Sequence, residues 1–223
     1  KEGGNDIYSG KILVPFPPES SLSWINHILQ PDETIIYTKN IEIDSNSPLN
    51  DFYEFNPENK SIINSKGHLF LNIDACDFIA DISINNQNCF KGEIGYIPHS
   101  IEITNYFQHG NNTIAISVQD PTDTGPQPVG KQSLQPKGIF YTPCSGIWQT
   151  IWLETTPNDY ISDIKITPKI SENSLKIRYN YIQKVEKQDV IKITVFDKIN
   201  HSKIIHQIEK VTEKNNREIV LNF

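Results

Sequence analysis

The chain has 223 residues, with 20 Lys and Arg against 27 Asp and Glu, which gives a formal net charge of −7. This length supports a sizeable buried core in one large or two small domains. The acidic balance without basic runs argues against nucleic acid as a partner, because phosphate binding needs clustered Lys and Arg. No apolar stretch is long enough to cross a bilayer, so we expect no membrane partner either.

The absence of Met means that Lys1 is not expected to be a translated start, and we expect the chain to be excised from a longer protein. The cysteines, Cys76, Cys89 and Cys144, have irregular spacing, which indicates small buried side chains rather than a disulfide framework. The His residues are dispersed and show no spacing typical of metal ligands. We therefore expect no metal and no cofactor.

In chain order, the first predicted element has only a weak sequence signal. Residues 20–29 have apolar side chains at helical spacing behind serine caps, which indicates a short helix. The rest of the chain has a period of two, which is typical of strands that are wet on one face. Asn85 and Asn86 lie between two such runs and predict a hairpin turn, because Asn tolerates positive φ. The runs of alternating residues are 68–74, 79–84, 113–119, 149–154, 161–167, 174–181, 190–196, 203–209 and 218–223.

Residues 121–146 interrupt this alternation with five prolines and four glycines. Little of such a segment can pair in a sheet. Structureless loops longer than about 12–15 residues are uncommon in compact domains and are usually functional or disordered. Phe140 and Tyr141 favour an ordered, functional loop. A change of composition near residues 155–159, from a Gly-, Pro- and aromatic-rich half to one rich in Lys and Ile, predicts a domain boundary.

Three stretches together resemble glycoside hydrolase family 2, in its amino-terminal sugar-binding domain. They are KILVPFPPES at residues 11–20, LFLNIDACDFIADISINNQNCFKGEIGYIPHSIEIT at residues 69–104, and a closing segment that begins VQDPTDTGPQPVGKQ at Val118 and ends GIFYTPCSGIWQTIWLE at Glu154. The second is similar to the family's succession of an apolar strand, a "VDY"-like turn, a "VNG" hairpin and a "GGY" loop. The closing segment is the most specific of the three.

The resemblance implies an all-β fold with two parts. Residues 1–157 would form a jelly-roll, galactose-binding-domain-like β-sandwich, and residues 160–223 part of the immunoglobulin-like β-sandwich that follows it in this family. Such sandwiches usually need about 100 residues, so we expect closing strands to be missing after Phe223. The resemblance also implies that a first jelly-roll strand is missing before Lys1. Exposed sheet edges then predict a tendency to form homo-oligomers.

The resemblance also implies that the catalytic chemistry lies elsewhere. Glycoside hydrolysis needs two carboxylates roughly 5–10 Å apart, and in this family they belong to a (β/α)8 barrel that follows both sandwiches. The sequence contains no βαβ alternation, so we expect no catalytic residues in this chain and no activity of the chain alone. Its role would be to support the missing barrel and to lend a loop to the sugar pocket of a β-galactosidase-like parent.

Asp120 is the strongest candidate for a sugar contact. It ends the strand at residues 113–119, and in the resemblance the aspartate at this position hydrogen-bonds a sugar hydroxyl in the active site. The alternative is an Asx-type turn cap before Pro121.

Further candidates lie on the same loop. They are Asp123, Lys131, Gln132 and Tyr141, and for these an ordinary solvated or packing role is the alternative. Tyr96 and Trp148 have rings that could stack on a sugar, although core packing is the favoured interpretation.

A rival hypothesis is an independent lectin-like module that binds carbohydrate unaided. Such a module needs several polar side chains and a ring converging on one self-contained cleft, whereas the polar candidates here crowd a single loop. A plain interaction scaffold without a sugar role is the third hypothesis.

Overall fold

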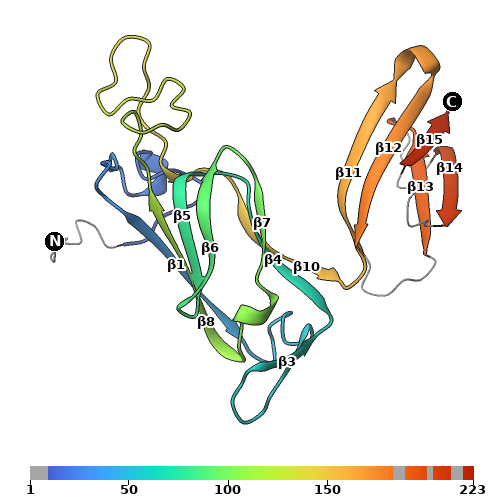
Figure 1. Cartoon of the computed structure of the whole chain (residues 1–223), viewed down its shortest axis with the longest axis horizontal. Helices are drawn as coiled ribbons and strands as arrows, with labels where there is room; N and C mark the ends of the chain where they lie inside the picture. The colour runs from blue at the N-terminus through green and yellow to red at the C-terminus, as the bar shows by residue number, and fades with distance from the viewer. Residues whose placement is uncertain (1–9, 183–188, 200–202, 212–217) are drawn as a thin grey trace. The chain divides into compact units, whose positions relative to one another are not determined.

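The computed structural model describes residues 10–182, 189–199, 203–211 and 218–223, which form strands, loops and three short 3-10 turns (Figure 1). The predicted all-β class is confirmed. The chain divides into two compact units, Lys1–Thr155 and Thr156–Phe223. In the described part of the chain, no helix has the length and apolar character needed to cross a membrane.

The main sheet of the first unit is antiparallel and has the order β1-β8-β5-β6. Its strands are β1 (Ile35–Ile43), β8 (Gly110–Gln119), β5 (Cys76–Ile84) and β6 (Gln87–Gly95). The short strand β9 (Gly146–Ile147) adds to the beginning of β5. The alternating residues 79–84 and 113–119 lie on strands, as predicted, and the structure shows that these strands, β5 and β8, pair with each other.

A second sheet has the order β10-β4-β7, with β10 (Ile151–Pro157), β4 (Gly67–Ile73) and β7 (His99–Glu102). A small hairpin of β2 (Tyr53–Phe55) and β3 (Ile62–Ser65) packs at its side. The 3-10 turn η2 (Thr104–Tyr106) follows β7.

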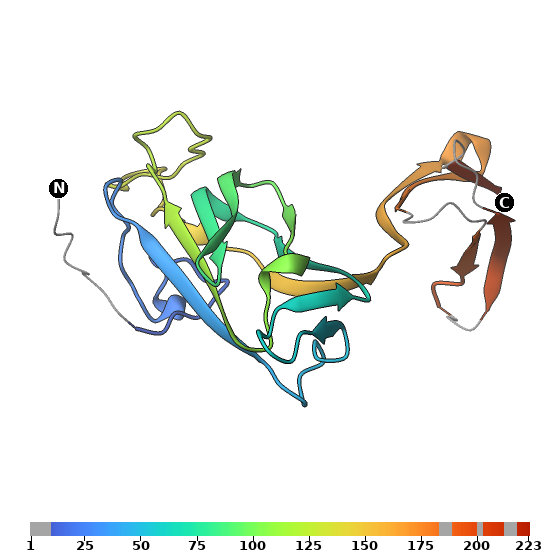
Figure 2. The ribbon, with the colours of Figure 1, turned by 60° about the horizontal axis from the view of Figure 1, so that its bottom comes forward.

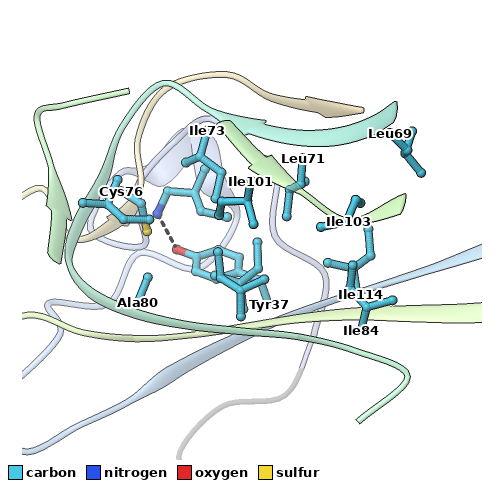
Figure 3. Close-up of a cluster of buried hydrophobic side chains, with 14 of the residues drawn as sticks. Tyr37, Leu69, Leu71, Ile73, Cys76, Ala80, Ile84, Ile101, Ile103 and Ile114 are labelled. Carbon is cyan, nitrogen blue, oxygen red and sulfur yellow. Dashed lines mark hydrogen bonds between the residues drawn. The ribbon is translucent and has the colours of Figure 1, made fainter. Parts of the chain in front are cut away.

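The inner faces of the two sheets share one apolar core, as expected for a β-sandwich. Figure 3 shows Leu69 and Leu71 of β4 and Ile101 of β7 facing Tyr37, Ile84 and Ile114 of the main sheet. Alternate residues of β8 are buried, which accounts for the period of two in its sequence. This core fixes the strand ends that carry the site described below.

Of the two local elements predicted from turn and cap residues, one forms and the other does not. Asn85 and Asn86 have φ values of 51° and 64° and connect β5 to β6, so the predicted hairpin turn is confirmed. The helix predicted at residues 20–29 is wrong: only the 3-10 turn η1 (Ser21–Ser23) forms. Ser20 caps this turn through its side chain, and Trp24 ends it in the left-handed region with φ 72°.

The second unit contains two smaller sheets around a separate core. The first has the order β11-β12-β15, with β11 (Tyr160–Lys169), β12 (Ser174–Ile182) and β15 (Glu218–Asn222). The second pairs β13 (Val190–Phe196) with β14 (Ile204–Val211). Strands were expected at all five places, whereas the assignment of this unit to an immunoglobulin-like sandwich stays a prediction. The 3-10 turn η3 (Ile170–Glu172) joins β11 to β12.

One prediction concerns Gly146, the first residue of β9. It has φ +68°, and a Cβ there would lie 2.1 Å from the hydroxyl oxygen of Tyr37, which itself accepts a hydrogen bond from the Ile147 amide at 3.2 Å. Because Tyr37 is buried and cannot move aside, Gly146→Ala should destabilise the first unit by more than about 2 kcal/mol. Thermal or denaturant unfolding of the chain measures this.

Gly138→Ala is the matched control, because Gly138 has a similar φ of +62° and no atom of the described residues lies within 4 Å of the added Cβ. It should cost only the backbone strain, about 1 kcal/mol. Equal losses for the two variants would contradict the proposed clash with Tyr37.

Candidate functional site

Three strand ends of the main sheet meet at one place and carry a long loop. β5 begins at Cys76, and β8 ends at Gln119. Asp77 pairs with Gly146 of β9, while Ile79 pairs with Gln119. The loop of residues 120–145 thus leaves the sheet beside the point to which it returns. Figures 1 and 2 both show this loop extending beyond the end of β8.

Asp120, the first residue of this loop, is only 1% exposed. Its Oδ1 accepts a hydrogen bond from the Thr122 amide at 2.7 Å, which is the Asx-type turn raised as the alternative reading. Its Oδ2 accepts a hydrogen bond from the Ser145 hydroxyl at 2.6 Å. Asp120 therefore ties the first residues of the loop to its last ones, and its contact with a sugar stays a prediction.

Glu19 binds the same end of the loop from the amino-terminal segment. Its Oε2 accepts a hydrogen bond from the Ser145 amide at 3.1 Å, and its Oε1 accepts one from the Leu29 amide at 3.4 Å. Burial raises the pKa of Glu19, although the hydrogen bonds from Ser145 and Leu29 partly offset the effect. Ser145, which is fully buried, is thus held between two carboxylates.

Asp77 is the functional candidate that the sequence reasoning missed. Its side chain is 2% exposed, and its Oδ2 lies 3.3 Å from the amide nitrogen of Gln132. Its Oδ1 is buried and accepts no hydrogen bond within the described part of the chain. Burial, followed by the nearby charge of Asp120, raises the pKa of Asp77 to about 6.

Of the loop residues predicted to bind substrate, Gln132 is the one whose side chain contacts Asp77 in the described part of the chain. Its Oε1 accepts a hydrogen bond from the Cys144 amide at 2.6 Å, and its Nε2 also lies 3.4 Å from the hydroxyl oxygen of Tyr96. Tyr96 is 50% exposed and packs edge-on against Trp148, with ring centroids 5.4 Å apart. The Nε1 donor of Trp148 is buried and finds no hydrogen-bond partner among the residues that the structure describes. Unused donors and acceptors therefore lie beside a half-exposed aromatic ring.

The other predicted residues remain on the outer part of the loop. Asp123 accepts a hydrogen bond from the Leu134 amide at 3.2 Å and is exposed, as is the side chain of Lys131. Tyr141 is 66% exposed, and its backbone joins the two arms of the loop, since its amide donates to the Lys131 carbonyl at 2.7 Å. The structure groups Asp77, Gln132 and Tyr96, but it does not bring Asp123 into that group.

The signal that could have identified Asp77 is its place in the sequence. An acidic residue between Cys76 and Phe78, inside an otherwise apolar run, is unusual for a structural strand. The two neighbouring thiols are no rival nucleophiles, because burial and the nearby carboxylates raise the pKa values of Cys76 and Cys144 to about 12. All three cysteines are free.

The arrangement accepts hydrogen bonds and does not resemble a metal site. Among the described residues, no group of three or more His, Cys, Asp and Glu side chains is arranged to hold a metal ion. A buried carboxylate with one unused oxygen can instead receive a hydroxyl or amide donor from a ligand.

The raised pKa of Asp77 makes a prediction about stability. The folded pKa of about 6 lies above the ordinary aspartate pKa of 3.8, so between pH 4 and 6 the folded chain binds more protons than the unfolded chain. The contribution of Asp77 to stability is therefore fully present below pH 4 and is lost as the pH rises through 6. The measurement is the free energy of unfolding of the wild type minus that of Asp77→Asn. This difference should fall as the pH is raised from 4 to 7.

Asp123→Asn, which removes an exposed carboxylate from the outer part of the same loop, is the control for the substitution itself. A wild-type stability that runs parallel to that of Asp77→Asn at every pH would show that Asp77 ionises normally.

Comparison with known proteins supports the family that the sequence resembles. The family described as "Glycosyl hydrolase 2 galactose-binding domain-like" matches residues 47–150. A protein of Formosa agariphila named "Putative beta-glucuronidase" is 34% identical over 99 residues, which are 44% of this chain and 11% of that protein. Human β-glucuronidase is 29% identical over 126 residues, which are 49% of this chain and 19% of that protein.

Solved structures extend the likeness of fold beyond that region. The β-glucuronidase of Bifidobacterium dentium, complexed with coumarin-3-O-glucuronide, matches with a TM-score of 0.67 and 15% identity, over 95% of this chain and 36% of its own. A β-glycosidase from Bacteroides vulgatus matches with a TM-score of 0.59 and 18% identity, over 85% of this chain and 21% of its own. At these identities the likeness shows the fold alone.

The chain spans only a minor part of each of these relatives, from 11% to 36% of their lengths. The matched region contains β4 to β9, the strand ends that carry Asp77 and Asp120, and the whole of the long loop. Residues 47–150 are therefore similar to the galactose-binding-like domain of glycosyl hydrolase family 2.

Proposed function

We propose that this chain is the non-catalytic amino-terminal region of a larger family 2 glycosidase and that it forms one wall of the carbohydrate site. The observation that carries the proposal is the Oδ1 of Asp77, which is buried at the sheet end that carries the loop and accepts no hydrogen bond from the described residues. Buried polar atoms in folded proteins nearly always have a partner. A sugar hydroxyl is a suitable donor, since bonds to a carboxylate are strong and directional.

Each neighbour of Asp77 has a role in this proposal. The half-exposed ring of Tyr96, supported by Trp148, offers a face on which the apolar side of a pyranose packs. Tyr141 and Lys131 extend the wall along the loop. Asp120 remains a proposed sugar contact, because each carboxylate oxygen can accept a second hydrogen bond beyond those from Thr122 and Ser145.

We further propose that the outer part of the loop rests on a catalytic barrel. Ile139, Phe140 and Tyr141 are consecutive and between 50% and 68% exposed. Three consecutive exposed large apolar residues are typical of a surface that becomes covered in an assembly. The barrel would supply both catalytic carboxylates.

The carboxylates of this chain are poorly suited to catalysis by themselves. Hydrolysis of a glycoside needs a proton donor and a nucleophile or base on either side of the bond that breaks. Both oxygens of Asp120 and both oxygens of Glu19 accept hydrogen bonds from the protein. Asp77 alone among the three has an unused oxygen, which suits a binding role.

The sugar itself is the finer part of the proposal. The resemblance implies a β-galactoside, whereas the curated relatives carry the name β-glucuronidase, so both substrate types belong in the assay. Homo-oligomers remain a prediction that sedimentation velocity of the chain tests.

The test is the replacement of Asp77 by Asn in the full-length glycosidase. Losing a charged acceptor for a sugar hydroxyl should lower kcat/KM by about tenfold or more on the preferred aryl β-glycoside. Asp81→Asn is the matched control, because Asp81 is a half-exposed residue of the same strand that binds Asn88 and Lys91. It should leave kcat/KM unchanged.

Unchanged turnover in the Asp77 variant would remove its proposed role. Titration of the 223-residue chain alone with galactosides and glucuronides distinguishes this proposal from the lectin hypothesis. Saturable binding with a Kd below about 1 mM would favour an independent lectin-like module over one wall of a shared site.

A further inference from the structure

Gln132 connects the loop to Asp77 through a side chain whose orientation is chemically determined. Its Oε1 lies 2.6 Å from the amide nitrogen of Cys144. A backbone N–H can only donate, so the oxygen of the Gln132 amide must face Cys144. The NH2 group then faces the Oδ2 of Asp77 at 3.3 Å and the hydroxyl of Tyr96 at 3.4 Å.

No cation accompanies the Asp77 carboxylate in the described part of the chain. The charged or titratable groups that act on it or respond to it are Asp120 after β8, Glu19 of the amino-terminal segment, Tyr96 after β6, Cys144 before β9 and Cys76 of its own strand. Among the described residues, the amide of Gln132 donates the one hydrogen bond that the side chain of Asp77 accepts.

The loop holds Gln132 in place from both sides. The amide of Tyr141 donates to the Lys131 carbonyl at 2.7 Å, and the Ser133 amide donates to the Tyr141 carbonyl at 2.9 Å. Gln132 and Tyr141 accordingly form a parallel bridge. The position of the Gln132 amide is thus fixed by the pairing of the two arms of the loop.

We propose that Gln132 is a positioning residue: by holding Oδ2 of Asp77 it turns Oδ1 toward the bound sugar, and the same amide sets the hydroxyl end of Tyr96. This inference rests on the proposed function of Asp77 as a sugar contact. It differs from the expectation that Gln132 itself binds substrate, because both ends of its amide are already engaged. The loop then sets the orientation of the Asp77 carboxylate through the side chain of Gln132.

The choice of an amide at this position has a physical reason. Glu at residue 132 could still accept from the Cys144 amide, but its second oxygen would face the Asp77 carboxylate. Two carboxylates at hydrogen-bond distance are stable only when they share a proton. Leu would fill the same space without donating, which would leave both oxygens of Asp77 unpartnered.

The first experiment follows the carboxyl carbon of Asp77 by NMR in the 223-residue chain as the pH is varied. Gln132→Leu removes the donor that favours the charged form, so the pKa of Asp77 should rise above the wild-type value of about 6. Gln132→Glu should produce two coupled titration steps. Gln135→Leu and Gln135→Glu, on the exposed part of the same loop, are the controls and should leave the Asp77 titration unchanged.

The second experiment measures kcat/KM of the full-length protein with the same variants. Gln132→Leu should lower kcat/KM about tenfold. Gln132→Glu should keep activity at acid pH and lose it as the pH rises, because the shared proton is then lost. A purely structural role would lower activity equally at every pH.

The outcomes separate this inference from the function on which it rests. If Asp77→Asn lowers kcat/KM while Gln132→Leu changes neither kcat/KM nor the Asp77 titration, the positioning role is overturned. If the titration shifts as expected but Asp77→Asn leaves kcat/KM unchanged, the sugar contact is overturned instead. Should Gln132→Leu fail to fold, Gln132→Asn takes its place: its amide is one methylene too short to reach both Cys144 and Asp77, so the same loss is expected.

Discussion

The structure of the site depends on the binding of Ser145 by two carboxylates, the buried Asp120 and the partly buried Glu19. Asp120 accepts from its hydroxyl and Glu19 from its amide, so a single serine joins the end of β8, the amino-terminal segment and the last turn of the loop before β9. This connection brings the long loop back onto the start of β5. The 26 residues from 120 to 145 are thereby held at the sheet end where Asp77 lies.

This connection has an electrostatic cost. Asp120 and Glu19 lie close enough to Asp77 to raise its pKa, and burial raises the pKa values of both Asp77 and Glu19. A domain selected only for stability gains little from such an arrangement, because unpaired buried charge is expensive. Perturbed carboxyl groups with an unused oxygen are instead typical of binding and active sites. The cost is therefore consistent with a ligand that completes the hydrogen bonding of Asp77.

Much of the fold could be predicted from the sequence because sandwich strands carry their own signal. In β8 the buried residues alternate strictly, so the strand was found with nearly the correct bounds. In β1 the signal is masked, since Ile36 is 63% exposed and an exposed Lys39 occupies the alternating position between Tyr37 and Ile41. The helical spacing at residues 20–29 was misleading, because Pro18 and Glu19 fix the segment through contacts distant in sequence.

The site was less predictable than the fold. Asp120 could be identified from its place after a strand, but whether its oxygens face a ligand or the loop depends on Ser145, which lies 25 residues away. Asp77 was missed because the apolar strand around it reads as core. The pairing of Gln132 with Asp77 spans 55 residues, and no local pattern indicates it.

The most direct test of the account is a crystal structure of the full-length protein with a non-hydrolysed β-glycoside bound. We expect a sugar hydroxyl within about 2.6–3.2 Å of the Oδ1 of Asp77, with the Gln132 amide still on Oδ2. A sugar that occupies the catalytic barrel with Asp77 still buried and without a ligand contact would contradict the account.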